Sequence, residues 1–216
     1  MDVGQLIAVG VIAVVTLAGS YLFPSREERD QRELEAYPDT LVSEGSGAVR
    51  VTGRVHGVRE LLEAPLTGRP CVAYELIVGG QMPAGYLRLM NQQDARPFLV
   101  TDESGTARVD TSGPFRLALR PQVGTTSGPY PGKHKALSLL LESRGLRAEN
   151  WLGRWRRLNY AERVLEQEQL VSIGGPSDRE PDPTAERSGP RSPPLRLVLR
   201  GTENHPLVIA ANKKKA

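Results

Sequence analysis

Few side chains in this sequence are of types that perform covalent chemistry. Cys71 is the single cysteine, and it begins the apolar segment Cys-Val-Ala-Tyr-Glu-Leu-Ile-Val. A nucleophilic cysteine needs a base within reach, whereas an unpaired cysteine is among the most buried residue types in proteins. We therefore expect a core thiol at Cys71 and keep a cysteine nucleophile as the alternative.

The three histidines, His56, His134 and His205, lie far apart in the sequence. None stands at metal-ligand spacing from another histidine or from Cys71, so the pattern gives no support to a structural zinc site. No metal or other cofactor is expected.

Two pairs of acids are the remaining candidates for general acid–base catalysis, Asp102/Glu103 and Asp178/Glu180. Both pairs stand among Gly, Ser and Pro residues, which are typical of turns and solvated loops. The sequence therefore assigns no catalytic residue, and an enzyme that uses an acid pair stays an alternative.

The elements that must position these side chains are mainly β-strands. Apolar and polar residues alternate over 48–55, as in a half-buried strand. Other short segments with strand character are 71–78, 97–101, 106–110, 115–119, 170–175, 195–200 and 207–210. Helices are expected over 134–143 and at the start of 159–169. The stretches 79–96 and 124–132 read as a polar connection and a loop, and 176–194, rich in proline, as a disordered loop.

The predicted fold is mainly β (α+β), a compact barrel or sandwich-like domain over residues 45–211 with one or two helices. A charged stalk, 24–44, precedes it, and a basic tail, 212–216, follows. A chain of this length is sufficient for one domain with its own core.

Residues 4–23 carry no charged side chain. Twenty residues of helix span about 30 Å, the thickness of the hydrocarbon core of a bilayer. We expect a single transmembrane helix here. A cleaved signal peptide is the first alternative, although the preceding residues contain no basic side chain. A buried core helix is the second, although apolar residues occupy every side of this segment.

The charges that flank this segment predict its orientation. Arg26, Arg29 and Arg32 follow it, and no Lys or Arg precedes it. Basic residues remain on the cytoplasmic side, so we expect a single-pass protein of the cell membrane with its N-terminus outside and its domain in the cytoplasm. The single cysteine is consistent with a reducing compartment.

The bulk charge limits the class of partner. The formal net charge is only +3, and aromatic residues make up 5% of the chain. Neither value is typical of a nucleic-acid surface, which needs a basic patch and stacking rings. The expected partners are the bilayer, through residues 4–23, and an unidentified protein; no nucleic acid is expected.

Several short motifs occur in an order that goes beyond composition. They are Val-Thr-Gly-Arg-Val at 51–55, the segment 62–75 with the turn Pro-Leu-Thr-Gly-Arg-Pro, Phe-Leu-Val-Thr-Asp-Glu-Ser-Gly at 98–105, Ala-Arg-Val at 107–109, Tyr-Ala-Glu-Arg-Val-Leu at 160–165 and Leu-Val-Ser-Ile-Gly at 170–174. This set resembles the GIDE-type, or "beside a membrane", domain over about residues 45–211. That domain occurs in mitochondrial and chloroplast-envelope E3 ubiquitin ligases and in stand-alone prokaryotic forms.

The resemblance implies a domain held next to a membrane. In the ligases of this family, activity resides in a separate RING whose zinc ions need about eight Cys or His ligands. This chain has one cysteine, so ligase activity is not expected. The second membrane span of the eukaryotic relatives also has no counterpart here, because the apolar stretch 137–141 is too short.

These observations favour a non-enzymatic, membrane-tethered interaction or sensing module at the cytoplasmic membrane surface. Two alternatives from other classes stay open. One is a membrane-bound hydrolase or transferase that uses Cys71 or an acid pair, and the other is an OB-like oligonucleotide binder.

Overall fold

The computed structural model describes residues 26–82, 85–126, 135–146, 158–182 and 194–212, and it is mainly β, as the sequence predicts. The apolar segment 4–23, His134, most of the proline-rich stretch and residues 213–216 lie outside the described residues. Neither helix in the described ranges has the length and hydropathy required to cross a membrane.

Five strands close into a barrel. In order around the barrel they are β1 (Gly47–Gly57), β6 (Phe98–Thr101), β7 (Thr106–Asp110), β12 (Leu195–Arg200) and β11 (Leu170–Pro181). Each strand pairs with the next, and β11 pairs back to β1. All these pairings are antiparallel except β7 with β12, which is parallel.

The connectivity of the barrel is a Greek key. Strands β1, β6 and β7 follow one another in a meander, and β11 returns to lie beside β1. A fourth strand that returns beside the first defines the Greek key, and a five-stranded Greek-key barrel is the architecture of OB-folds. The described structure therefore has an OB-like barrel with two long insertions, one between β1 and β6 and one between β7 and β11.

The barrel core is formed by the inward-facing residues of these strands. Alternate residues of a strand point to the same side, so Val51, Val55, Phe98, Val100 and Ile173 are fully buried together. The predicted periodicity of 48–55 and the predicted hairpin over 97–110 are thus confirmed.

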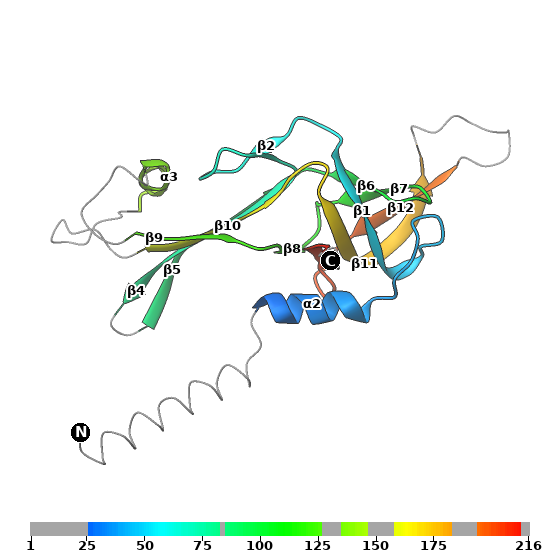
Figure 1. Ribbon diagram of the computed structural model, residues 1–216, viewed down its shortest axis with the longest axis horizontal. Coiled ribbons are helices and arrows are strands. Elements are labelled where there is room, and N and C mark those ends of the chain that lie inside the picture. Colours follow the sequence, from blue (N-terminus) through cyan, green and yellow to red (C-terminus); the bar gives the residue numbers. More distant parts are fainter. Residues whose placement is uncertain (1–25, 83–84, 127–134, 147–157, 183–193, 213–216) are drawn as a thin grey trace, which may run out of the picture.

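Helix α2 (Arg26–Ala36) covers an extension of this sheet. Strand β13 (Leu207–Ala211) pairs with β11, and β8 (Phe115–Ala118) pairs in parallel with β13. Leu34 of α2 is 2% exposed and packs with Val208 and Ala210. Residues 26–36 of the expected charged stalk form this helix, and they pack along the domain (Figure 1).

A second sheet extends to one side of the barrel (Figure 1). Its strands, in spatial order, are β5 (Gly85–Ala95), β4 (Ala73–Met82), β10 (Leu158–Leu165) and β9 (Gln122–Thr126). The predicted helix is confirmed as α3 (Lys135–Ser143), whose Leu137 and Leu141 pack on this sheet. A short ribbon of β2 (Leu62–Glu63) and β3 (Pro70–Cys71) encloses the predicted turn.

Four sequence-based assignments are wrong. Residues 79–96 are not a connection, because most of them belong to the hairpin β4–β5. The sequence of β5 is polar because β5 is an edge strand of its sheet. The segment 159–169 begins as a strand, because β10 is paired along both edges. Residues 124–126 belong to β9, and β11 continues through 176–181 to pair with β12, so this part of the expected disordered loop is ordered.

Candidate functional site

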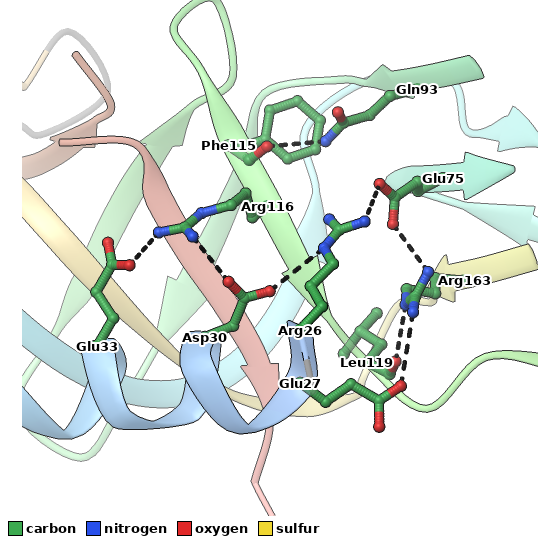
Figure 2. A network of polar contacts seen from close by, with 10 residues as sticks. All are labelled: Arg26, Glu27, Asp30, Glu33, Glu75, Gln93, Phe115, Arg116, Leu119 and Arg163. Atoms are coloured by element: carbon green, nitrogen blue, oxygen red, sulfur yellow. Dashed lines mark hydrogen bonds and ion pairs between the residues drawn. The ribbon is translucent and has the colours of Figure 1, made fainter. Parts of the chain in front are cut away.

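Charged side chains are buried where α2 meets the two sheets (Figure 2). Asp30 of α2 and Glu75 of β4 are each 2% exposed, and Arg163 of β10 is 7% exposed. Charged groups are almost never fully buried unless they are paired. We call the group formed by these residues with Arg26 and Arg116 the charge cluster.

Glu75 binds two arginines from opposite directions. Arg26 Nη1 donates to Glu75 Oε1 at 2.9 Å, and Arg163 Nη1 donates to Glu75 Oε2 at 3.1 Å. Arg163 Nε also donates to the carbonyl oxygen of Leu119 at 3.2 Å, and its Nη2 lies 3.5 Å from Glu27 Oε1. Through Glu75 and Arg163, the first turn of α2 is bonded to β4, β10 and the end of β8.

Asp30 joins the middle of α2 to β8. Arg116 Nη1 donates to Asp30 Oδ1 at 2.8 Å, and Arg116 also pairs with Glu33. Asp30 Oδ2 lies 3.6 Å from Arg26 Nε, an ion pair too long for a hydrogen bond. Removing one partner of such a buried set leaves an uncompensated charge, which makes the arrangement specific for one position of α2.

A third buried carboxylate lies on the second sheet, on the face opposite to Glu75 and Arg163. Glu162 of β10 is 1% exposed. Its Oε1 accepts a hydrogen bond from the amide of Leu66 at 2.8 Å, and its Oε2 accepts one from Thr67 at 3.1 Å. The predicted turn 65–70 is therefore held on β10 by a buried side chain.

Cys71 lies beneath this turn and has no accessible surface. Burial raises the pKa of its thiol to about 11, and the negative charge of Glu162 acts in the same direction. Because the thiolate is the reactive form of cysteine, this environment opposes the nucleophile alternative. The expectation of a core thiol is confirmed.

The two acid pairs occupy different places. Partial burial acts to raise the pKa of Asp102, but hydrogen bonds from the amides of Val42, Ser104 and Gly105 hold the pKa of this carboxyl below its usual value. Glu103 beside it is exposed. The first pair is thus a turn pair, as expected.

Asp178 and Glu180 lie on strand β11 and not in a solvated loop, which corrects their expected position. Asp178 is exposed. Glu180 accepts a hydrogen bond from Arg200 Nη2 at 3.1 Å. The acid pairs therefore form parts of a turn and of a strand pairing.

The histidines described here take surface roles. His56 Nδ1 lies 2.8 Å from Glu168 Oε1, and His205 lies in the turn between β12 and β13. Over the described ranges, no three side chains of His, Cys, Asp or Glu are grouped so that they could hold a metal ion.

A shallow groove of about 490 Å³ runs along the outer face of the barrel at β1 and β6. We call it the barrel groove; among the residues that line it are Leu41, Thr52, Arg54, His56, Thr101 and Glu103. Small-molecule sites are mostly apolar and enclosed. This groove is open and mixed in polarity, so it is better suited to a segment of another macromolecule.

Sequence reasoning did not single out Asp30, Glu75, Glu162 or Arg163. One signal was present: Glu75 is the only charged residue in the predicted strand 71–78. A charge within an otherwise apolar strand calls for a buried partner, but the identity of that partner depends on tertiary contacts.

Comparisons of the chain with protein-family models, with curated proteins and with solved structures found no match. The function is therefore inferred from the geometry of the charge cluster and from the sequence.

Proposed function

We propose that this protein is a membrane-tethered, non-enzymatic interaction module. In this proposal residues 4–23 span the cell membrane once, the N-terminus lies outside, and the OB-like domain lies on the cytoplasmic face, where it binds a protein partner. The resemblance to GIDE-type domains supports the same location.

The single observation that carries the proposal is the attachment of α2 to the domain. Arg26 begins α2 only three residues after the apolar segment ends, and it is hydrogen-bonded to the buried Glu75. A solvated stalk needs no buried ion pairs. A helix that sets the orientation of a domain relative to its anchor does, because the pairs allow one position of α2.

The tether is tested with the full chain in bacterial membranes. We expect the protein to stay in the membrane fraction during alkaline carbonate washing and to be released by detergent. The mass of the membrane-bound protein, measured by mass spectrometry, should show that its N-terminal residues are retained. Protease should cleave the domain in inverted vesicles and leave it intact in spheroplasts. A soluble full chain, loss of residues 1–20, or cleavage from outside would overturn the proposal.

The partner is sought by cross-linking in native membranes. A photo-cross-linking residue in place of Thr52, in the barrel groove, should capture a protein of defined mass. The matched control places the same residue at Glu63, which is exposed on the turn side of the second sheet. A variant without residues 1–24 shows whether capture needs the membrane. Equal adducts at both positions would contradict a partner at the groove.

Oligonucleotide binding is the second candidate, because the barrel topology favours it. OB-folds bind oligonucleotides on the face of their second and third strands, which correspond here to β6 and β7. Base stacking needs exposed aromatic rings, yet Phe98, the only Phe, Tyr or Trp of β1, β6 and β7, is fully buried. The imidazole of His56 is the one partly exposed ring on these three strands, and a single ring is not a stacking platform. The interaction module is therefore favoured.

A fluorescent oligonucleotide separates the two functions. Affinity for the detergent-solubilised full chain that falls roughly tenfold or more between 50 and 200 mM salt would support nucleic-acid binding. Affinity that is absent, or that does not change with salt, would exclude it.

A further inference from the structure

The backbone of β1 is unpaired at one residue in the barrel groove. On the edge of β1 that faces away from β11, the amide of Arg50 donates to the carbonyl oxygen of Pro38 at 2.8 Å, and its carbonyl oxygen accepts the amide of Thr40 at 2.9 Å. From Arg54 onward the same edge of β1 pairs with β6. Thr52 lies between these two pairings.

The gap at Thr52 has a local cause. Alternate residues of a strand direct their amide and carbonyl groups to the same edge, so Thr52 faces the same way as Arg50. If the segment 38–40 continued alongside β1, the amide of Val42 would donate to Thr52. It donates instead to Asp102 Oδ2 at 2.9 Å. Among residues 26–82 and 98–110, Thr52 therefore makes no backbone hydrogen bond on this edge.

Two cavities meet at this residue. Thr52 lines the barrel groove and also a neighbouring cavity of about 240 Å³, which is lined mainly by residues between 39 and 44. Leu41 lines both cavities as well, and it is 38% exposed. The unpaired backbone thus lies beside an exposed apolar side chain. This combination suits an extended peptide, which binds through its main chain and places alternate side chains in pockets.

The lining of the two cavities is mainly acidic. It contains one arginine, Arg54, one histidine, His56, and four acids, Asp39, Glu44, Asp102 and Glu103. Arg54 and His56 both bind Glu168 already, Arg54 through the carbonyl oxygen and His56 through the carboxylate. Charges of this sign attract a basic ligand and repel the phosphates of a nucleic acid.

Two of the four acids have partners within the domain. Asp39 pairs with Arg50, and Asp102 accepts backbone amides. Glu44 and Glu103 are exposed, and neither forms an ion pair over the described ranges. Glu44 lines only the smaller cavity and Glu103 only the barrel groove. Each cavity therefore contributes one carboxylate that is left for a ligand.

From these observations we infer that the barrel groove binds an extended, basic segment of the protein partner. One residue of the segment pairs with the backbone of Thr52, and its Lys or Arg side chains bind Glu44 and Glu103. The inference rests on the proposed function, because it names the kind of partner segment that the interaction module takes.

The test uses the full chain in lipid nanodiscs and a phage-displayed library of random peptides. We expect the selected peptides to be rich in Lys and Arg. The double variant Glu44→Arg with Glu103→Arg should weaken binding of a selected synthetic peptide roughly tenfold or more. The matched control, Glu63→Arg with Glu203→Arg, reverses two exposed acids that do not line the groove. It should leave the affinity nearly unchanged.

The backbone contact is tested on the peptide, so that the protein is not altered. N-methylation removes one amide donor from the peptide. At the position that pairs with Thr52 it should weaken binding roughly tenfold or more, and at the adjacent positions it should have little effect. Hydrogen exchange at the amide of Thr52 should slow when the unmodified peptide is bound.

The inference is overturned if no peptide or only acidic peptides are selected, if the two double variants lose affinity equally, or if exchange at Thr52 does not change. Displacement of the peptide by a single-stranded oligonucleotide would also overturn it, because the groove would then be a nucleic-acid site. Failure of the proposed function has different readouts: the chain would not co-elute with the discs, or the cross-linker at position 52 would capture no membrane partner. Capture of a partner without binding of a basic peptide would leave the proposed function standing and exclude this inference.

Discussion

Glu162 and Arg163 are consecutive residues of β10, and their side chains are buried on opposite faces of the same sheet. Glu162 accepts the amides of Leu66 and Thr67 on one face. Arg163 binds Glu75 and the carbonyl of Leu119 on the other. Strand β10 therefore connects the turn on one face of the sheet with α2 on the other.

Loss of the Arg163 guanidinium tests this connection. Arg163→Met removes the partner of a carboxylate that is 2% exposed, so Glu75 is left with one arginine and Leu119 O loses its donor. We expect the free energy of unfolding of the detergent-solubilised full chain to fall by about 3–5 kcal/mol in urea titrations.

Arg69→Met is the matched control for this substitution. Arg69 pairs with Glu166, just beyond β10, but both side chains are about half exposed. Its loss should cost less than about 1 kcal/mol. Similar losses in the two variants would show that the charge cluster does not hold α2.

The sequence predicts the barrel well and the charge cluster poorly. Alternation identifies strands such as β1 and β7 because one face of each is buried in the core. The same rule fails for β5, an edge strand that reads as polar, and for β10, whose Tyr160, Ala161, Val164 and Leu165 satisfy helical spacing as well as strand spacing. Pairing along both edges decides in favour of the strand, and such pairing is a tertiary property.

The charge cluster depends on the same kind of information. Asp30 and Glu75 are separated by 45 positions in the chain, and both pair with Arg26 only in the folded domain. The sequence alone does not distinguish Asp30 from the other acids. The sequence shows that Glu75 is unusual in its apolar strand. It does not predict that Arg26 of α2 neutralises this charge.

The thiol of Cys71 should be inert in the folded protein. Because its pKa is raised to about 11, iodoacetamide at pH 7.5 should modify it at least a hundredfold more slowly than a cysteine introduced at Asn212. Modification should become complete in urea. Rapid labelling of the folded chain would restore the cysteine-enzyme alternative.

The same shift predicts how stability depends on pH. The pKa of the folded state lies above that of an unfolded cysteine, so the protonated thiol contributes stability that is fully present below about pH 9. This contribution is lost as the pH rises from about 9 to about 11. Unfolding midpoints of the wild type should fall more steeply over this range than those of Cys71→Ala. Parallel pH profiles would contradict the assignment.

The turn carboxylate Asp102 gives the opposite dependence on pH. Its folded pKa is lowered, so its stabilising contribution is present above the usual value near 4 and is lost as the pH falls. Asp102→Asn should cost about 1–2 kcal/mol at pH 7 in urea unfolding, because one partly buried acceptor is replaced by a donor. The difference in the free energy of unfolding between Asp102→Asn and the wild type should shrink below about pH 4.

The control is Asp178→Asn, at an exposed site. It should change the free energy of unfolding by less than about 0.5 kcal/mol at either pH. A loss equal to that of Asp102→Asn would indicate an effect of net charge and not of the hydrogen bonds to Asp102.

Gly174 of β11 tests the contact between α2 and the barrel without altering any charge. A Cβ at this position would lie 2.7 Å from Tyr37 Cδ2 and 2.8 Å from Leu34 Cδ1. Leu34 is 2% exposed and has little room to move, so Gly174→Ala must push the helix outward at a cost of about 1–3 kcal/mol. Hydrogen exchange should then accelerate in α2 while β1 and β6 stay protected.

In the control, Gly105→Ala, the new Cβ meets Val42 Cγ1 at an ordinary 3.6 Å, and exchange in α2 should not change. If α2 exchanged at the same rate in all three proteins, the helix would not be held by this packing, and the proposal that α2 sets the orientation of the domain relative to a membrane anchor would lose its structural basis.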